Sequence, residues 1–291
     1  MAAPNNRDAA ITLNSGVQAS PLQRSLGSSA WICAHPDRQI PQLGFGVYRS
    51  PPEITSRTVL AALDAGYRHI DSAQWYFNEE QVGSAIQSSS YPRSSVFLTT
   101  KLGHADRIME RLEEGVAMID PRPDGYVDLY TRADGGAGEE AARRNDWGIK
   151  LVRPHREDDL SGTHVEMEGY SRIPLVINQI ELHPWCQQPA IVSYCQARNI
   201  ALEAYSPLVQ GKKASDPTLT KIAKETGKTW AQVLIRWSLQ RGFIPLPKSD
   251  SRDRIIANID VFDFQLTVGQ MLALNALDKD EHVCLNPTEC P

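Results

Sequence analysis

The stretch Gly66-Tyr67-Arg68-His69-Ile70-Asp71-Ser72-Ala73-Gln74-Trp75-Tyr76-Phe77-Asn78-Glu79-Glu80 organises the rest of the chain. It predicts a short strand over 69–71 that carries Asp71 at its C-terminal end, and a loop that presents Tyr76. Glu79 and Glu80 open the next helix, where carboxylates suit the positive end of the helix dipole. An aspartate and a tyrosine beside one strand end indicate the start of a proton-transfer site.

Strands and helices alternate along most of the chain. Strands are predicted at 40–48, 69–71, 95–101, 125–130, 148–152, 175–181, 200–205 and 243–247. Helices are predicted at 51–65, 79–87, 105–118, 188–198, 217–226, 230–240, 251–258 and 268–277. This alternation indicates a parallel sheet, and polar residues at the strand ends favour a closed α/β barrel, which needs about 250 residues. With no linker in the sequence, we expect one domain over 40–291 after an irregular leader at 1–39.

The composition is that of a globular protein, with 41% hydrophobic residues, 22% charged residues and a formal net charge of −5. This mild acidity excludes the electrostatic footprint of a nucleic-acid-binding or membrane-surface protein. No apolar run approaches the roughly 18 residues of a spanning helix, and residues 1–29 do not resemble a signal peptide. The five cysteines are scattered without a C-x-x-C motif. We therefore expect a cytoplasmic protein with reduced thiols, no metal site, and neither membranes nor nucleic acid as partners.

Polar or aromatic residues that are far apart in the sequence follow predicted strands or lie at their ends: Asp71, Tyr76, Lys101, Gln179, Tyr205 and Lys248. In a barrel they would converge on one mouth. A phenol with a pKa near 10 is a poor acid at neutral pH. A lysine close to the Tyr76 oxygen would lower that pKa, and an aspartate would hold the lysine charged and in place. Singly, Tyr76 could be a wall residue and Asp71 a cap, but together they indicate proton transfer.

The segment from Pro247 to Arg254 lies between a strand and a helix start. Its lysine, hydroxyls and arginine suit a phosphate at a helix N-terminus, although a solvated charged turn has the same composition. Tyr205 could stack on a planar heterocycle or pack in the core. The stretch 136–141 fits the G-x-G-x-x-A dinucleotide pattern, with Asp158 further on. We reject that interpretation, because Glu139 and Glu140 would face the pyrophosphate and the glycines do not follow the strand directly.

These motifs resemble the aldo-keto reductase family, whose members are (β/α)8 TIM barrels that use NADPH to reduce aldehydes and ketones. The resemblance rests on the stretches 43–46, 66–83, 97–102, 127–130, 177–185, 204–208 and 244–258. It covers most of 40–130 and nearly all of 173–280. It implies a small carbonyl compound as substrate and a monomeric enzyme.

The resemblance also implies a role for each matching residue. Tyr76 would be the general acid, tuned by Lys101 and Asp71, and Asp71 would also border the cofactor. Gln179 would bond the nicotinamide carboxamide and Tyr205 would stack on that ring. The remaining cofactor contacts would be Ser206 and Leu208 at the pyrophosphate, Lys248, Ser249 and Arg254 at the 2′-phosphate, and Asn258 at the adenine. An aromatic substrate pocket would comprise Tyr48, Trp75 and Trp185. Ala257 stands where the family has an acidic residue, which predicts weaker adenine contacts.

The chain departs from the family at 131–172. After Asp128-Leu129-Tyr130 the family continues with Leu-Ile-His, whereas this chain has Thr131-Arg132-Ala133-Asp134. The histidine that polarises the substrate carbonyl is therefore missing from its place, as is the Ser-Asn of the next strand. We expect the barrel to be imperfect around the fourth and fifth βα units, and the abrupt change is typical of a shifted reading frame or misjudged splice. The alternative hypothesis for function is a catalytically impaired barrel that binds NADPH.

Overall fold

The computed structural model describes residues 10–11, 39–102, 108–122, 125–132 and 177–284. Parallel strands run through these residues in two sheets: β3 (Phe45–Gly46), β4 (His69–Asp71), β5 (Phe97–Leu102) and β6 (Leu129–Arg132), then β7 (Ile177–Glu181), β8 (Ala201–Tyr205) and β9 (Ile244–Pro245). Backbone hydrogen bonds of 3.1 Å from Gly44 to Pro245 and from Gly46 to Pro247 join the sheets. The strands therefore form one curved wall in the order β7-β8-β9-β3-β4-β5-β6.

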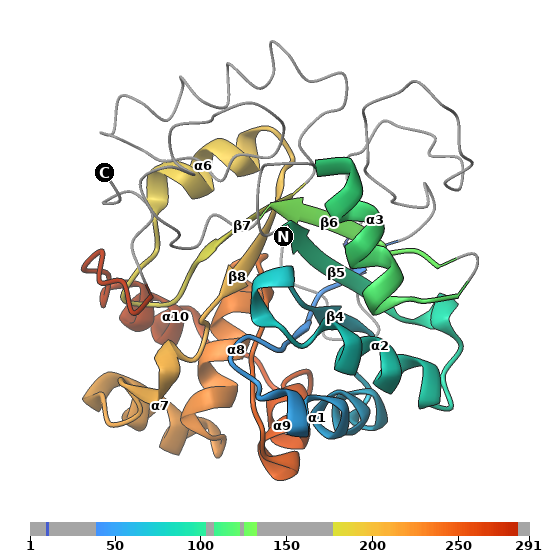
Figure 1. Cartoon of the computed structure of the whole chain (residues 1–291). Coiled ribbons are helices and arrows are strands. Elements are labelled where there is room, and N and C mark those ends of the chain that lie inside the picture. The colour runs from blue at the N-terminus through green and yellow to red at the C-terminus, as the bar shows by residue number, and fades with distance from the viewer. Residues whose placement is uncertain (1–9, 12–38, 103–107, 123–124, 133–176, 285–291) are drawn as a thin grey trace.

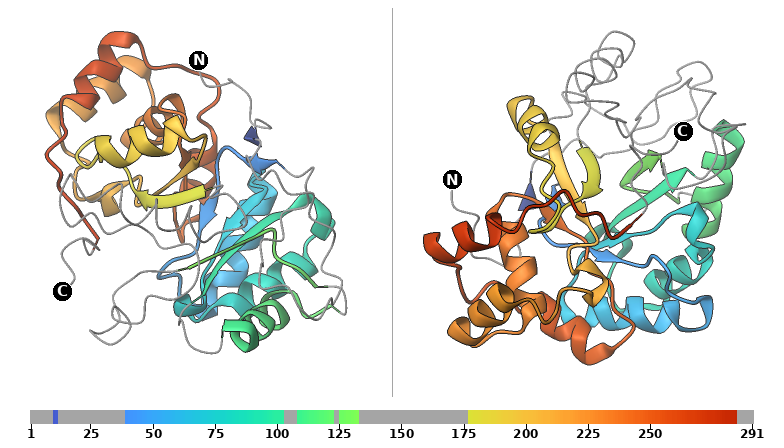
Figure 2. Two further views of the ribbon diagram at one scale, coloured as in Figure 1. Left: turned by 90° about the horizontal axis from the view of Figure 1, so that it is seen from above. Right: turned by 90° about the vertical axis from the view of Figure 1, so that its left-hand side faces the viewer.

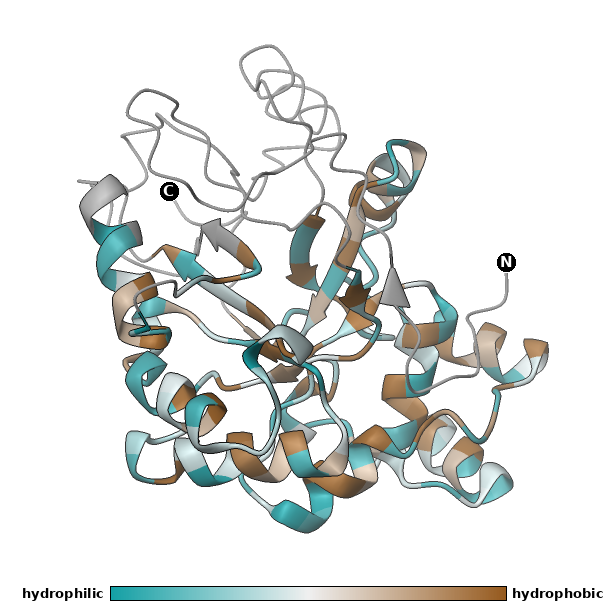
Figure 3. Cartoon of the chain, turned by 90° about the vertical axis from the view of Figure 1, so that its right-hand side faces the viewer, coloured by the Kyte–Doolittle hydropathy of each residue, from teal (hydrophilic) through white to brown (hydrophobic). Residues whose placement is uncertain are grey.

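Helices surround this wall (Figure 1, Figure 2). They are α1 (Pro52–Ala65), α2 (Glu79–Ser88), α3 (Ile108–Ile119), α6 (Pro189–Ala197), α7 (Pro217–Thr226), α8 (Trp230–Gln240), α9 (Arg252–Ile259) and α10 (Val268–Asn275). Their ends follow local chemistry. Gly66 ends α1 in the left-handed conformation with φ 110°, and Thr229 begins α8 with a capping box to Gln232. Hydrophobic residues gather on the central strands, whereas the helices carry both kinds of residue (Figure 3).

The bounds of two predicted strands differ most from those in the structure. The strand predicted over 40–48 is two pieces, β2 (Ile40–Pro41) and β3, and β2 pairs antiparallel with β1 (Ala10–Ile11). The strand predicted over 125–130 begins only at Leu129, because the Asp128 side chain accepts the Leu98 N–H at 2.9 Å in place of a regular ladder bond. The predicted strand at 148–152 and the glycine motif at 136–141 lie outside the described residues.

The interior of the wall is apolar at the N-terminal ends of the strands. One buried cluster consists of Ile40 of β2 and the first residues of four other strands, Phe97, Leu129, Ile177 and Ile244. Ala201 of β8 packs against this cluster. Side chains in a strand point the same way at every second position. The inward positions nearer the C-terminal ends are polar, so this arrangement leaves a closed bottom and a polar mouth. Within the described residues, none of the helices has the length and hydrophobicity that crossing a membrane requires.

Candidate active site

Asp71 and Lys101 form a buried ion pair at the polar mouth. Asp71 is the last residue of β4, and Lys101 is on β5. The Lys101 ammonium donates to both Asp71 carboxylate oxygens at 2.7 Å and to the Ser72 carbonyl at 2.8 Å. It also lies 3.4 Å from the Tyr76 hydroxyl. The structure therefore brings together the three residues for which the sequence predicts proton transfer.

The surroundings set the charges of Tyr76 and Lys101. Burial raises the pKa of Tyr76 and the Lys101 ammonium lowers it, with a net rise to about 12. The predicted lowering by lysine is therefore present, but burial outweighs it and Tyr76 is a protonated phenol at neutral pH. Burial alone would lower the pKa of Lys101; the Asp71 carboxylate outweighs that effect, so the pKa is raised and Lys101 is charged. The site holds a proton donor beside a fixed cation.

Gln179 connects the ion pair to a second acid that the sequence analysis did not identify. Its side-chain nitrogen donates to Asp71 Oδ1 at 3.0 Å and to Glu203 Oε2 at 2.7 Å. Glu203 on β8 is fully buried, and burial together with the Asp71 charge raises its pKa to about 8. The same amide nitrogen serves both acids, which leaves the Gln179 oxygen for another partner. The sequence signal that could have identified Glu203 is the alternation of side chains in β8, which places Glu203 on the same side as Tyr205.

Two further buried polar groups below the mouth were also missed. His69 donates to or accepts from Thr99 Oγ1 at 3.0 Å, and burial with the nearby Lys101 charge lowers the pKa of His69 to about 3. Glu79 accepts a hydrogen bond from the Thr100 hydroxyl, and burial raises its pKa to about 7. From its place in the sequence, Glu79 was predicted only to begin a helix. Its burial depends on how α2 packs on the wall, which no local pattern reports.

The predicted phosphate segment forms a compact polar turn before α9. Arg254 Nε donates to Ser249 Oγ at 3.2 Å, and the Ser251 N–H donates to the same hydroxyl at 3.2 Å. Lys248 forms an ion pair with Asp250. Arg254 is exposed, while Asn258 on α9 is buried. An anion binding here would meet Lys248, Arg254 and Ser249 together, and it would compete with Asp250 for the lysine.

The remaining predicted residues lie at different depths around β8 and β3. Tyr205 ends β8, and Ser206 follows it with a left-handed backbone (φ 50°) that turns the chain toward Leu208, just before η3 (Val209–Gly211). The Tyr48 ring is 47% exposed and its centroid lies 5.0 Å from that of Tyr76. Trp75 on η1 (Gln74–Tyr76) is half-buried, next to Tyr76 in the chain. Trp185 is only 2% exposed and packs in a hydrophobic cluster.

The sequence is similar to that of a known protein family. The sequence model described as Aldo/keto reductase family matches residues 42–132 and 163–279, more than half of the chain. The chain belongs to the aldo/keto reductase family. The unmatched interval 133–162 falls inside the departure that the sequence analysis placed at 131–172. The family histidine is expected directly after β6, at position 133, where the chain has Ala133 and the first matched stretch has ended.

Relatives agree with this assignment along most of their length. An uncharacterized oxidoreductase of Schizosaccharomyces pombe is 38% identical over 266 residues, which are 86% of this chain and 94% of that protein. The glyoxal reductase of Bacillus subtilis is 34% identical over 88% of this chain and 95% of its own. A Bombyx mori aldo-keto reductase solved in complex with NADP has a TM-score of 0.72 and 32% identity, covering 87% of this chain and 94% of that one. The predicted (β/α)8 barrel fold is thereby confirmed.

Proposed function

We propose that the protein reduces an aldehyde or ketone to an alcohol with NADPH, and that Tyr76 donates the proton. The observation that carries this proposal is the Lys101 ammonium, which lies 2.7 Å from both Asp71 oxygens and 3.4 Å from the Tyr76 hydroxyl. Membership of the aldo/keto reductase family supports it. The NADP-bound relative from Bombyx mori and the glyoxal reductase of Bacillus subtilis are consistent with this cofactor and reaction class.

The polar groups of the mouth fit NADPH. Lys248, Ser249 and Arg254 supply two cations and a hydroxyl beside the start of α9, which suits a phosphate monoester such as the 2′-phosphate. The Gln179 oxygen is left to accept from a carboxamide, and the half-buried Tyr205 ring offers a stacking face. Ser206, Leu208 and Asn258 complete the proposed cofactor contacts. Bound NADPH would supply a hydride to the carbonyl carbon.

The protein's own residues would manage the proton. Tyr76 is protonated at neutral pH, because burial raises its pKa to about 12. It can therefore donate to a carbonyl oxygen as negative charge develops there. The resulting phenolate would face the Lys101 ammonium at 3.4 Å. Asp71 keeps that ammonium in place, so Lys101 stabilises the deprotonated acid at the moment it forms.

The proposal also covers the substrate pocket, the domain bounds, the oligomeric state and the compartment of the protein. Tyr48, Trp75 and Trp185 are proposed as the aromatic walls of the substrate pocket, with Tyr48 against the Tyr76 ring. We place the catalytic domain at 40–291, after the leader at 1–39, and propose a cytoplasmic monomer. Cys186, Cys195 and Cys284 are free thiols in the structure, which supports a reducing compartment.

The direct test is NADPH oxidation by the purified protein with a generic aromatic aldehyde. Tyr76→Phe removes only the hydroxyl and should lower kcat by roughly 10²–10⁴-fold. Tyr91→Phe is a matched control, because Tyr91 packs on Arg68 and takes no part in the site. Unchanged carbonyl-dependent oxidation in Tyr76→Phe would refute the assignment. Cofactor fluorescence quenching without turnover across an aldehyde panel would instead identify an impaired, NADPH-binding barrel.

A further inference from the structure

A short segment near the C-terminus lies across the end of β7. We call residues 278–284 the C-terminal strap. The N–H groups of Lys279 and Glu281 donate to the Trp185 carbonyl at 3.2 and 2.9 Å, and the Val283 N–H donates to Glu181 Oε1 at 2.9 Å. Glu181 is the last residue of β7. The backbone N–H groups of the strap are therefore held by the Glu181 side chain at the end of β7 and by the Trp185 carbonyl in the turn after it, which places the strap over that turn.

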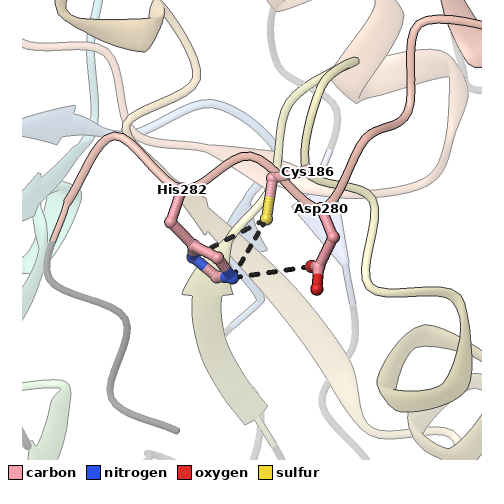
Figure 4. Close-up of side chains that lie close together, drawn as sticks. All are labelled: Cys186, Asp280 and His282. Atoms are coloured by element: carbon pink, nitrogen blue, oxygen red, sulfur yellow. Dashed lines mark hydrogen bonds and ion pairs between the residues drawn. The ribbon is translucent and has the colours of Figure 1, made fainter. Parts of the chain in front are cut away.

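Three potential metal ligands meet where the strap crosses this turn (Figure 4). The ligand atoms of Cys186, Asp280 and His282 all lie within 4.8 Å of one another. His282 Nε2 lies 3.5 Å from Cys186 Sγ and 3.6 Å from Asp280 Oδ1, and His282 Nδ1 lies 3.7 Å from the same sulfur. Sulfur, nitrogen and oxygen come from two segments almost a hundred residues apart, which is why no spacing in the sequence indicated the cluster.

The Glu181 carboxylate holds one edge of the His282 imidazole. Its Oε2 lies 3.0 Å from His282 Nδ1, and its Oε1 accepts the Val283 N–H at 2.9 Å. The carboxylate is thereby fixed between the strap backbone and the His282 ring. A carboxylate behind a metal-binding histidine is the usual outer-shell arrangement.

The local charge favours a cation. The Glu181 and Asp280 carboxylates lie 3.0 and 3.6 Å from the two nitrogens of His282, and the Asp280 oxygen lies within 4.8 Å of Cys186 Sγ. A divalent cation would offset this negative charge and would bind the sulfur as a thiolate.

The distances suit a tetrahedral ion. With a metal–sulfur bond of about 2.3 Å and metal–nitrogen and metal–oxygen bonds of about 2.0–2.1 Å, tetrahedral ligands are separated by roughly 3.3–3.6 Å. The observed separations of 3.5 and 3.6 Å fall in this range. Because the sulfur lies almost equally far from both ring nitrogens, the His282 ring must turn to aim Nε2 at the ion. We propose that Cys186, Asp280 and His282 bind a divalent transition metal of the Zn²⁺ type, with water as the fourth ligand.

Cobalt(II) titration of the purified full-length protein tests the site, because a cobalt–thiolate bond produces a charge-transfer absorption band. We expect this band to form and to be bleached by competing Zn²⁺. Cys186→Ser should abolish the band, and Cys284→Ser is the matched control that should retain it, since Cys284 contacts Ser206 rather than the cluster. A missing band in the wild type, or a band that survives Cys186→Ser or is lost with Cys284→Ser, would overturn the proposal.

A second measurement separates the ligands from the fold. Asp280 is 81% exposed at its side chain, so Asp280→Asn should fold normally. It should keep the thiolate band but weaken Co²⁺ binding at least tenfold, and His282→Gln should weaken it more. Zn²⁺ should raise the Tm of the wild type and of Cys284→Ser, and leave the Tm of Cys186→Ser unchanged. Equal Co²⁺ affinity in the wild type and both ligand variants would refute the assignment of Asp280 and His282.

Discussion

Replacing Lys101 with methionine is the sharpest test of the proposed site. Methionine keeps much of the side-chain length but removes the ammonium, which donates to both Asp71 oxygens at 2.7 Å and to the Ser72 carbonyl at 2.8 Å. Among the described residues, Asp71 would keep one side-chain donor, Gln179 at 3.0 Å. Breaking a buried ion pair by removing one partner costs about 3–5 kcal/mol. That is a large fraction of the about 5–15 kcal/mol by which native domains are stable.

The double variant separates charge from packing. Asp71→Asn alone leaves the Lys101 ammonium buried without its carboxylate and should also destabilise the fold. Lys101→Met/Asp71→Asn leaves no uncompensated charge, so we expect it to recover roughly 2 kcal/mol or more of the summed losses, within the range for residues in contact. Denaturant unfolding of the wild type and the three variants measures this coupling. If the stability losses of the two single variants simply add in the double variant, the ion-pair argument is refuted.

Activity should respond differently from stability. Without the ammonium, the Tyr76 phenolate that forms during the reaction has no cation at 3.4 Å. We expect kcat for carbonyl reduction to fall by roughly 10²–10⁴-fold in Lys101→Met, with NADPH affinity nearly unchanged. The double variant should regain stability but not kcat. Recovery of kcat in the double variant would show that Lys101 acts only through folding.

Three further substitutions follow from the structure. Arg254→Gln should raise the KM for NADPH roughly 10- to 100-fold, because a charge-assisted hydrogen bond contributes about 1.5–3 kcal/mol. It should leave the KM for NADH unchanged, since NADH has no 2′-phosphate. Equal effects on both cofactors would contradict the 2′-phosphate assignment. The pKa of Glu203 is raised to about 8 in the folded protein, so the folded protein keeps this proton at pH values at which the unfolded chain, with a pKa near 4.5, has lost it. The stability that this group contributes is therefore lost as the pH rises from about 4.5 to about 8. Glu203→Gln should remove a slope of up to about 1.4 kcal/mol per pH unit between these two values, measured by urea unfolding, and an unchanged slope would be inconsistent with a neutral Glu203. Gly44→Ala should cost about 1–3 kcal/mol, because its Cβ would lie 2.5 Å from Leu246 and 2.7 Å from His69; an unchanged Tm would argue against this close approach.

Local sequence patterns were sufficient to predict the strands and helices wherever the signal lies within a few residues. The stretch from Gly66 to Glu80 predicted the strand, the loop and the helix in their observed order, and the alternation of elements predicted the parallel barrel. Bounds were less accurate at 40–48 and 125–130. There, the end of pairing depends on contacts with other strands, such as the bond between Asp128 and Leu98.

Partnerships across the barrel came only from the tertiary structure. The sequence indicated Asp71 and Gln179 as separate residues, but only closure of the wall brings them within 3.0 Å and adds Glu203. The net pKa of Tyr76 likewise depends on burial, which outweighs the lysine that the sequence analysis emphasised. The periods of strands and helices are local and can be read along the chain. Distance, burial and protonation depend on residues that are far apart in the sequence, by 25 positions for Lys101 and Tyr76 and by 108 for Asp71 and Gln179, so the fold alone decides them.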